Sequence, residues 1–148
     1  MNVKIEPIQK EDILNIIPLV QKINVKTPLS ILEKRFLKMA ALPHYECIGM
    51  FIDNKLIGVT GLWYSVRHYI GKSVEPDHVV IDEAYRGKNL GKQLFEWVYT
   101  YTKSKGYEAV ELNTYTGNTK SHKFYYNEGF NIYGFHFLKV IRNDERFY

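Results

Sequence analysis

Hydrophobic and polar positions change their spacing several times along the 148 residues, and each change predicts a structural element. Residues 3–8 indicate a short strand, and the apolar positions of residues 13–23 then recur at helical spacing. Pro18 falls inside that helical pattern, so we expect it to kink or split the helix. A second helix is expected to begin at Thr27, as its N-cap, and to end before Pro43.

The middle and the end of the chain alternate between strand and helix patterns. A polar turn at residues 53–55 joins two predicted antiparallel strands, and an irregular stretch over 65–76 precedes a third. The remaining expected elements are a strand at 77–81, a helix from 90, a strand at 109–113, a helix at 119–128 and one or two strands within 130–141. The strand–helix–strand unit of 77–113 requires a parallel crossover. We therefore expect one mixed α/β (α+β) domain over 1–148.

Composition places the chain among ordinary globular proteins, with 45% hydrophobic and 24% charged residues. A single cysteine, Cys47, excludes a disulfide scaffold and favours a buried thiol over a covalent acyl-enzyme. No apolar run approaches the roughly 18 residues of a membrane helix, and no signal peptide is evident, so we expect a cytoplasmic protein away from membranes. The net charge of +4 is dispersed, which does not favour nucleic-acid binding, and the five scattered histidines predict no metal site.

A glycine-containing turn, Arg-Gly-Lys-Asn-Leu-Gly over residues 86–91, lies between a predicted strand and a predicted helix. The first N–H groups of a helix have no partner within it, so such a turn can bind an anion. Asn89 stands where another small residue is expected, and asparagine tolerates the left-handed conformation. The spacing of Gly87 and Gly91, followed by Gln93, excludes a nucleoside-triphosphate P-loop. A turn that binds no ligand stays open at this point.

Two sequence blocks resemble the GCN5-related N-acetyltransferase (GNAT) superfamily. The turn matches the family signature R/Q-x-x-G-x-G/A, with Asn89 in place of the usual glycine. Residues 118–130 resemble the second block, N-x-x-A-x-x-F-Y-x-x-x-G-F, with Ser121 in place of alanine. The resemblance implies a partly splayed central sheet of six to seven strands, with about four helices on both faces. It also implies transfer of an acetyl group from acetyl-CoA to a primary amine of a small molecule or protein, by direct attack in a ternary complex.

The resemblance also assigns the cofactor contacts. The pantetheine arm of acetyl-CoA is expected along Val79, Val80 and Ile81, and Asn118 and Tyr125 beside it. The pyrophosphate is expected on the turn, which comprises Arg86, Gly87, Lys88, Asn89, Leu90, Gly91 and Lys92.

The chemistry needs a proton donor and a proton acceptor. Tyr125 matches the family's general acid, and a phenol with a pKa near 10 is protonated at neutral pH. Glu75 lies near the place of a glutamate base in some relatives, and Asp77, His78 or a water chain are alternatives. The acceptor amine is expected near the first two helices, the 65–76 stretch and the final strands. A non-catalytic acyl-CoA-binding module is the alternative function, and a homodimer is possible.

Overall fold

The computed structural model describes residues 1–144, 146 and 147. The chain falls into two compact units, residues 1–111 and 112–148, and each unit is described by itself. The expectation of a single domain over 1–148 stays a prediction.

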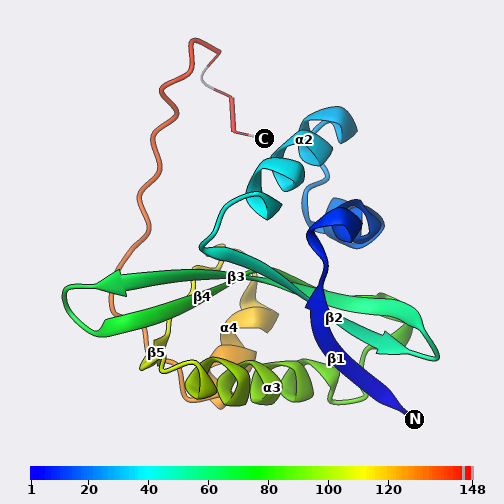
Figure 1. Ribbon diagram of the computed structural model, residues 1–148. Coiled ribbons are helices and arrows are strands. Elements are labelled where there is room, and N and C mark those ends of the chain that lie inside the picture. Colours follow the sequence, from blue (N-terminus) through cyan, green and yellow to red (C-terminus); the bar gives the residue numbers. More distant parts are fainter. Residues whose placement is uncertain (145, 148) are drawn as a thin grey trace. The chain divides into compact units, whose positions relative to one another are not determined.

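The first unit is built on one five-stranded sheet in the order β1-β2-β3-β4-β5 (Figure 1). Its strands are β1 (Val3–Ile8), β2 (Tyr45–Ile52), β3 (Lys55–Arg67), β4 (Gly71–Ile81) and β5 (Ala109–Val110). The first four strands pair antiparallel, and β4 pairs parallel with β5. The mixed α/β fold is confirmed, but the expected six to seven strands are wrong.

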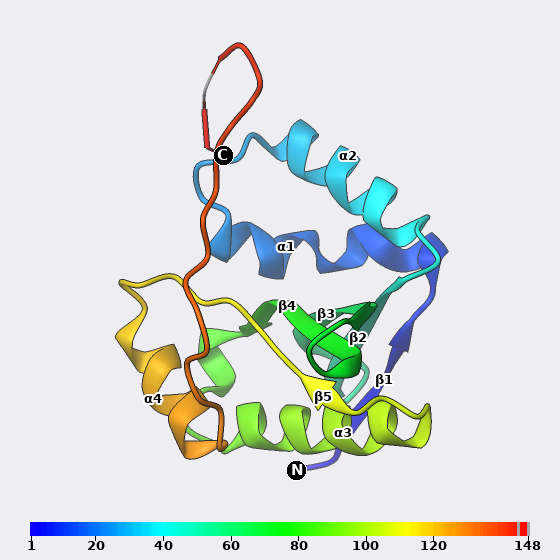
Figure 2. The ribbon, with the colours of Figure 1, turned by 90° about the vertical axis from the view of Figure 1, so that its left-hand side faces the viewer.

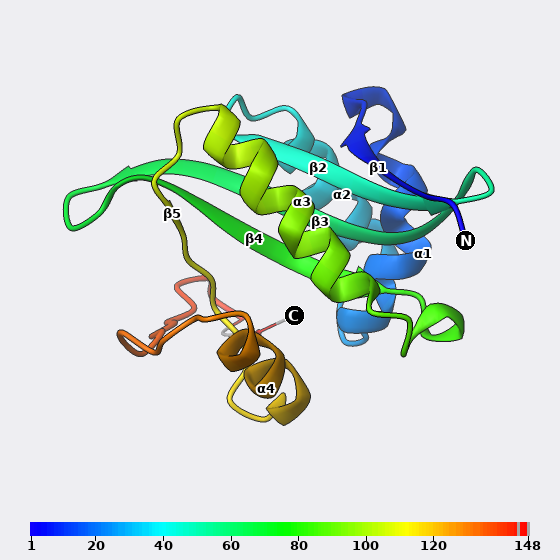
Figure 3. The same cartoon turned by 90° about the horizontal axis from the view of Figure 1, so that it is seen from below.

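Helices cover both faces of this sheet (Figure 2). On one face lie the 3₁₀ helix η1 (Lys10–Ile16), the short helix α1 (Ile17–Val20), the 3₁₀ helix η2 (Gln21–Ile23) and α2 (Leu29–Ala40). On the other face α3 (Leu90–Ser104) runs diagonally across the strands (Figure 3). Pro18 lies in the first turn of α1, so the expected split of the first helix is confirmed. The N-cap of α2 is Pro28 rather than Thr27, and no side chain caps that helix.

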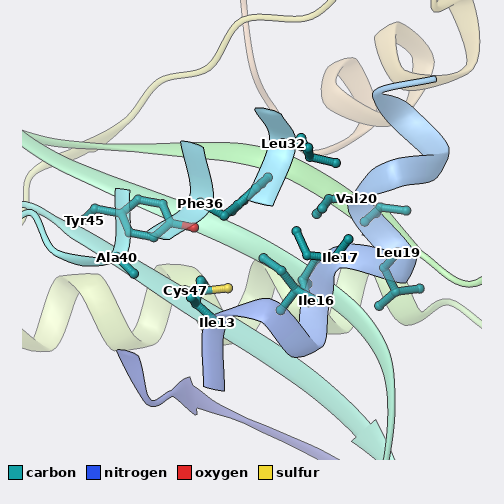
Figure 4. Close-up of a cluster of buried hydrophobic side chains, with 12 residues drawn as sticks. Ile13, Ile16, Ile17, Leu19, Val20, Leu32, Phe36, Ala40, Tyr45 and Cys47 are labelled. Atoms are coloured by element: carbon teal, nitrogen blue, oxygen red, sulfur yellow. The ribbon is translucent and has the colours of Figure 1, made fainter. Parts of the chain in front are cut away.

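Each face has its own core of buried apolar side chains. The cluster under α1 and α2, drawn in Figure 4, joins Ile16, Phe36, Cys47 and Val80 with eight further buried residues. The cluster under α3 contains Leu94 and Val98 from the helix and, from the sheet, Ile48, Met50, Ile52, Ile57, Leu62 and Val74. Two dry interfaces fix the sheet between its helices, since burial of apolar area is the main force that holds such layers together.

Residues 65–76, expected to be irregular, form the outer part of a long hairpin. The β3–β4 ladder continues through Tyr64↔Val74 to Arg67↔Gly71, and Gly71 takes a positive φ of 88° where the turn ends. The expectation was wrong because turn residues near position 70 and polar residues on the strands interrupt the alternation of apolar and polar positions that marks a strand. The hairpin is well visible at the far end of the sheet in Figure 1.

The second unit contains α4 (Thr119–Asn127), which ends before Gly129 at φ 93°. Among its described residues no strand follows, so the one or two strands expected within 130–141 are absent. Phe135 and Phe137 of this segment are 86% and 90% exposed. An alternating pattern becomes a strand only when its backbone pairs with a neighbour, and this segment forms no such ladder.

Candidate active site

The glycine turn connects the end of β4 to the start of α3. Asp82 caps the short 3₁₀ helix η3 (Glu83–Tyr85) by accepting a 3.1 Å hydrogen bond from the Ala84 N–H. Gly87 follows at φ 79°, and Asn89, the N-cap of α3, lies in the left-handed region at φ 60° and ψ 24°. Asparagine is one of the few residues other than glycine that adopt this conformation routinely, so the departure at position 89 preserves the turn.

The N-terminus of α3 presents backbone donors and positive charge. No side chain caps the helix, and its first turn contains no acidic residue. The first N–H groups, those of Leu90, Gly91 and Lys92, lie ahead of the first i→i−4 bond, which Gln93 donates to the Asn89 carbonyl over 3.2 Å. Such donors and the helix dipole favour an anion.

Three basic side chains of the turn remain at its surface. Arg86 lies 3.7 Å from Glu83, Lys92 lies 3.5 Å from Glu96, and the Lys88 ammonium stands 5.4 Å from the centre of the Tyr85 ring. Surface ion pairs of this kind are weak, and their cations can turn toward a ligand at little cost. The turn therefore combines uncapped backbone donors with exposed basic side chains, which suits an anion.

Beside the turn, β4 separates from β5. Only Ser73 and Val74 pair with β5, and the last bond is donated by the Glu111 N–H to the Val74 carbonyl over 3.0 Å. From Pro76 to Ile81 the strand has no strand partner on this side among the described residues. The Val80 side chain is buried under α2, and Val79 and Ile81 pack toward α3. Their backbone, rather than their side chains, is what an extended amide-containing ligand would meet.

A β-bulge interrupts β4 close to this opening. Gly61 pairs with Asp77 and Val59 with Val80, so Thr60 alone opposes both His78 and Val79. The extra residue, His78, has a positive φ of 40°. The buried Thr60 hydroxyl lies 2.9 Å from the Gly61 carbonyl and 3.3 Å from the Asp77 carbonyl, so both acceptors beside the bulge can share its proton. A bulge turns the following side chains and is common beside functional sites.

The three proposed bases lie on the α1/α2 side of the sheet, and the bulge brings His78 to the same face as Asp77. Asp77 accepts hydrogen bonds from the Trp63 indole N–H at 3.0 Å and from the His78 backbone N–H at 2.8 Å. Glu75 is half-buried and pairs in register with Trp63. The His78 Nε2 atom lies 2.7 Å from the Tyr45 hydroxyl, and the edge of the imidazole meets the Phe36 ring. Burial lowers the pKa of His78 to about 4, so this histidine is neutral at pH 7.

Asn118 and Tyr125 belong to the second unit. The Asn118 side chain caps α4 by accepting a 3.4 Å hydrogen bond from the Ser121 N–H. The Tyr125 ring packs between Phe124 and Phe130, with ring centres 5.5 and 5.7 Å away. Burial raises the pKa of Tyr125, so its hydroxyl keeps its proton at neutral pH. Its neighbour Tyr126 is 56% exposed.

Comparison with known proteins decides the family. The model of the acetyltransferase (GNAT) family matches residues 16–130, which include the turn, the bulge and α4. The chain belongs to the acetyltransferase (GNAT) family. A curated relative, the aminoalkylphosphonate N-acetyltransferase of Salmonella typhimurium, is 30% identical over 90 residues; the match covers 60% of this chain and 58% of the relative.

Solved structures share the fold of this chain. A possible acetyltransferase from Clostridium difficile 630 superposes with a TM-score of 0.81 at 15% identity, covering 96% of this chain and 100% of that one. The aminoglycoside acetyltransferase AAC(6')-Iy, in complex with a bisubstrate analogue, has a TM-score of 0.81 at 16% identity, covering 96% and 99%. At these identities the likeness concerns the fold alone.

Two residues around His78, Tyr45 and Gly61, were not predicted from the sequence. Tyr45 contacts His78 from a strand 33 residues earlier in the chain, and nothing local marks that contact. Gly61 leaves room for it, because a Cβ at this position would come within 2.2 Å of His78 Nε2. A glycine inside a strand is a known sign of a close approach, and that signal was available.

Cys47 is buried, and burial raises the pKa of its thiol to about 12, which leaves it unreactive at neutral pH. Among the described residues, no group of three or more His, Cys, Asp or Glu side chains is placed to hold a metal ion. Over the same residues, every helix is too short or too polar to span a bilayer.

Proposed function

We propose that this protein is an acetyl-CoA-dependent N-acetyltransferase that acts on a primary amine by direct attack in a ternary complex. The observation that carries the proposal is the N-terminus of α3, where uncapped backbone donors follow two left-handed residues, Gly87 and Asn89. Together with membership of the GNAT family, this turn is the best site in the chain for the diphosphate of coenzyme A. Residues 86–92 would hold it through their main chain.

The open edge of β4 supplies the second part of the proposed site. Backbone groups between Pro76 and Ile81 would pair with the pantetheine amides as an added strand. The thioester would then lie near the bulge, where a backbone N–H can stabilise the oxyanion of the tetrahedral intermediate. Tyr125 would donate its proton to the departing sulfur. The acceptor amine would lose its proton to Glu75, with Asp77, His78 or a water chain on the α1/α2 side of β4 as alternatives.

The acceptor is proposed to be a primary amine of a small molecule or of a protein. Relatives in the family are named for amines of different charge, an aminoalkylphosphonate and an aminoglycoside. On the α1/α2 side of β4, the Trp63 ring lies 4.7 Å from Tyr45 and 5.5 Å from His44, and Asp77 lies at the Trp63 indole. Aromatic faces beside a carboxylate suit an ammonium group.

The release of free CoA thiol from acetyl-CoA, measured with a panel of primary amines, tests this function. Tyr125→Phe should lower kcat by about 10²-fold, within the usual range for a lost general acid, whereas Tyr126→Phe should have little effect. Equal effects of the two variants would remove the acid assignment. Gly91→Val should abolish the thermal stabilisation by acetyl-CoA, and a variant that is stabilised as well as the wild type would exclude the turn. Binding of acetyl-CoA without transfer to any amine would instead indicate a non-catalytic binding module.

A further inference from the structure

The strand β5 is joined to the sheet over a very short length. It has two residues, and among the described residues it pairs with β4 alone. At its start the Glu108 N–H donates to the Lys72 carbonyl over 2.8 Å, and at its end the Glu111 N–H donates to the Val74 carbonyl over 3.0 Å. A strand this short gains few backbone bonds, so side-chain contacts matter for where it lies.

One carboxylate, that of Glu111, gathers such contacts at the end of β5. It accepts hydrogen bonds from the Ser73 hydroxyl at 2.5 Å and from the Tyr69 hydroxyl at 2.6 Å. The Arg67 guanidinium lies 3.6 Å from the same group. Ser73 is a fully buried residue of β4, Arg67 ends β3, and Tyr69 lies in the turn between the two strands. The carboxylate therefore ties the end of β5 to both strands of the long hairpin.

The Glu111 carboxylate is ionised at neutral pH. Burial by itself would raise its pKa, but the hydrogen bonds from Ser73 and Tyr69 and the charge of Arg67 lower the pKa below the ordinary value. Hydrogen bonds to an ionised acceptor are stronger than those between neutral groups. The contacts of Glu111 are thus of the kind that can hold a short strand in one place.

Glu111 stands where the open edge of β4 begins. Its N–H makes the last bond that β5 donates to β4, at Val74. Backbone groups face alternate sides along a strand, so Pro76 is the next residue of β4 to face β5. Proline has no N–H and cannot donate the next bond of the ladder. Pro76 on one strand and Glu111 on the other therefore define the point at which the two strands part.

We propose that Glu111 is a positioning residue for acetyl-CoA, which fixes the point where β5 leaves β4 and keeps the β4 backbone from Pro76 to Ile81 open for the pantetheine arm. The inference rests on the proposed acetyl transfer. A ligand that pairs as an added strand binds best when the edge it meets already has one register, because ordering that edge on binding costs affinity. Glu111 contacts no reacting group in this scheme and acts through the course of β5.

Glu111→Gln is the main test, with Glu108→Gln as the matched control. Glu108 lies at the other end of β5, where its carboxylate accepts a 2.9 Å hydrogen bond from the Lys72 N–H. Both variants remove one negative charge beside β5, but only Glu111 lies at the opening. In Glu111→Gln we expect the Kd of acetyl-CoA, measured by calorimetry, to rise at least about tenfold, and the KM to rise with it while kcat changes much less. Glu108→Gln should bind acetyl-CoA as the wild type does.

Two further measurements keep the test independent of the stability of Glu111→Gln. Tyr69→Phe removes one contact of the carboxylate at an exposed position, and we expect it to weaken acetyl-CoA binding about two- to threefold. Combined with Glu111→Gln it should add little, because both changes remove the same interaction. Without ligand, hydrogen exchange of the N–H at position 111 should quicken in Glu111→Gln, since its bond to the Val74 carbonyl loses support.

Equal Kd values for acetyl-CoA in the wild type, Glu111→Gln and Tyr69→Phe would overturn this role of Glu111. An equal loss of affinity in Glu111→Gln and Glu108→Gln would overturn it too, because any loosening of β5 would then suffice. A Glu111→Gln protein that melts at a lower temperature but binds acetyl-CoA normally while folded would assign the carboxylate to stability alone. A wild-type protein that binds no acetyl-CoA would overturn the proposed function itself, and the positioning role with it.

Discussion

Replacing Glu46 should destabilise the protein strongly for a carboxylate that is partly exposed to solvent. The Glu46 side chain, 25% exposed, extends from β2 toward the C-terminal end of α3. It accepts hydrogen bonds from the Tyr64 hydroxyl at 2.7 Å and from the Tyr101 hydroxyl at 2.9 Å. The Lys105 ammonium lies 3.5 Å from the same carboxylate and 4.4 Å from the centre of the Tyr101 ring. One carboxylate thus joins β2, β3 and α3.

The contacts set the expected loss. A hydrogen bond to a charged group contributes about 1.5–3 kcal/mol, and the half-buried position of both phenols favours the lower value. The exposed ion pair adds at most about 1 kcal/mol. Glu46→Ala should therefore lower the free energy of unfolding by about 3 kcal/mol, or the melting temperature by roughly 6–12 °C for a chain of this size. Glu46→Gln keeps one acceptor oxygen and should lose about half as much.

Urea denaturation followed by far-UV circular dichroism measures these differences. Glu6→Ala is the control, because the Glu6 carboxylate is 44% exposed on β1 and lies 3.0 Å from the Lys4 ammonium, and its loss should cost less than about 0.5 kcal/mol. In the Tyr101→Phe background, Glu46→Ala should cost less than it does alone, since one of its bonds is already missing. A Glu46→Ala protein as stable as Glu6→Ala would refute the reasoning.

Three further predictions follow from the site. Asn89→Val should weaken acetyl-CoA binding at least about tenfold by calorimetry, because a β-branched residue resists φ 60°, whereas Asn89→Gly should bind like the wild type. The unfolded chain protonates His78 below pH 6.5 and the folded one only below about 4, so stability should fall by about 3 kcal/mol as the pH drops through that window. His78→Asn should lack this part of the acid loss in urea titrations. Gly61→Ala should cost about 1–3 kcal/mol in the same assay, since its methyl group would lie 2.2 Å from His78 Nε2; a neutral effect would mean that the ring is free to move.

Local signals in the sequence were enough for the helices and for the turn. The glycines and Asn89 predict the junction between β4 and α3, because the left-handed conformation limits which residues can stand there. Pro18 marked the break in the first helix for the same kind of reason, a fixed φ and a missing N–H. Such restrictions act within a few residues and can be recognised without knowing the fold.

The strands that were predicted wrongly depend on pairing partners elsewhere in the chain, which no local sequence pattern identifies. The alternating segment 130–141 was expected to add one or two strands, and the structure gives it no ladder. The stretch 65–76 was expected to be irregular, and pairing such as Ser65↔Ser73 makes it a hairpin. A strand is stable only with its neighbour in register, so its existence is a property of two segments rather than one.

The side chains of the site show the same contrast between local sequence signals and partners that lie far away in the chain. The sequence favoured Glu75 as the base, by its resemblance to some relatives, and left Asp77, His78 or a water chain as alternatives, because all three side chains lie on one short stretch and each type can accept a proton. They became different only when β2 and β3 were placed beside them: Trp63 and a backbone N–H occupy the Asp77 oxygens, whereas Gly61 opens space for His78 and Tyr45 bonds one of its nitrogens. A single extra residue in β4 produces this arrangement, since without the bulge His78 would point to the α3 side, away from Tyr45. The surroundings of these three side chains therefore depend on the register of β4 against β3, and Gly61 matters because it leaves room for the imidazole.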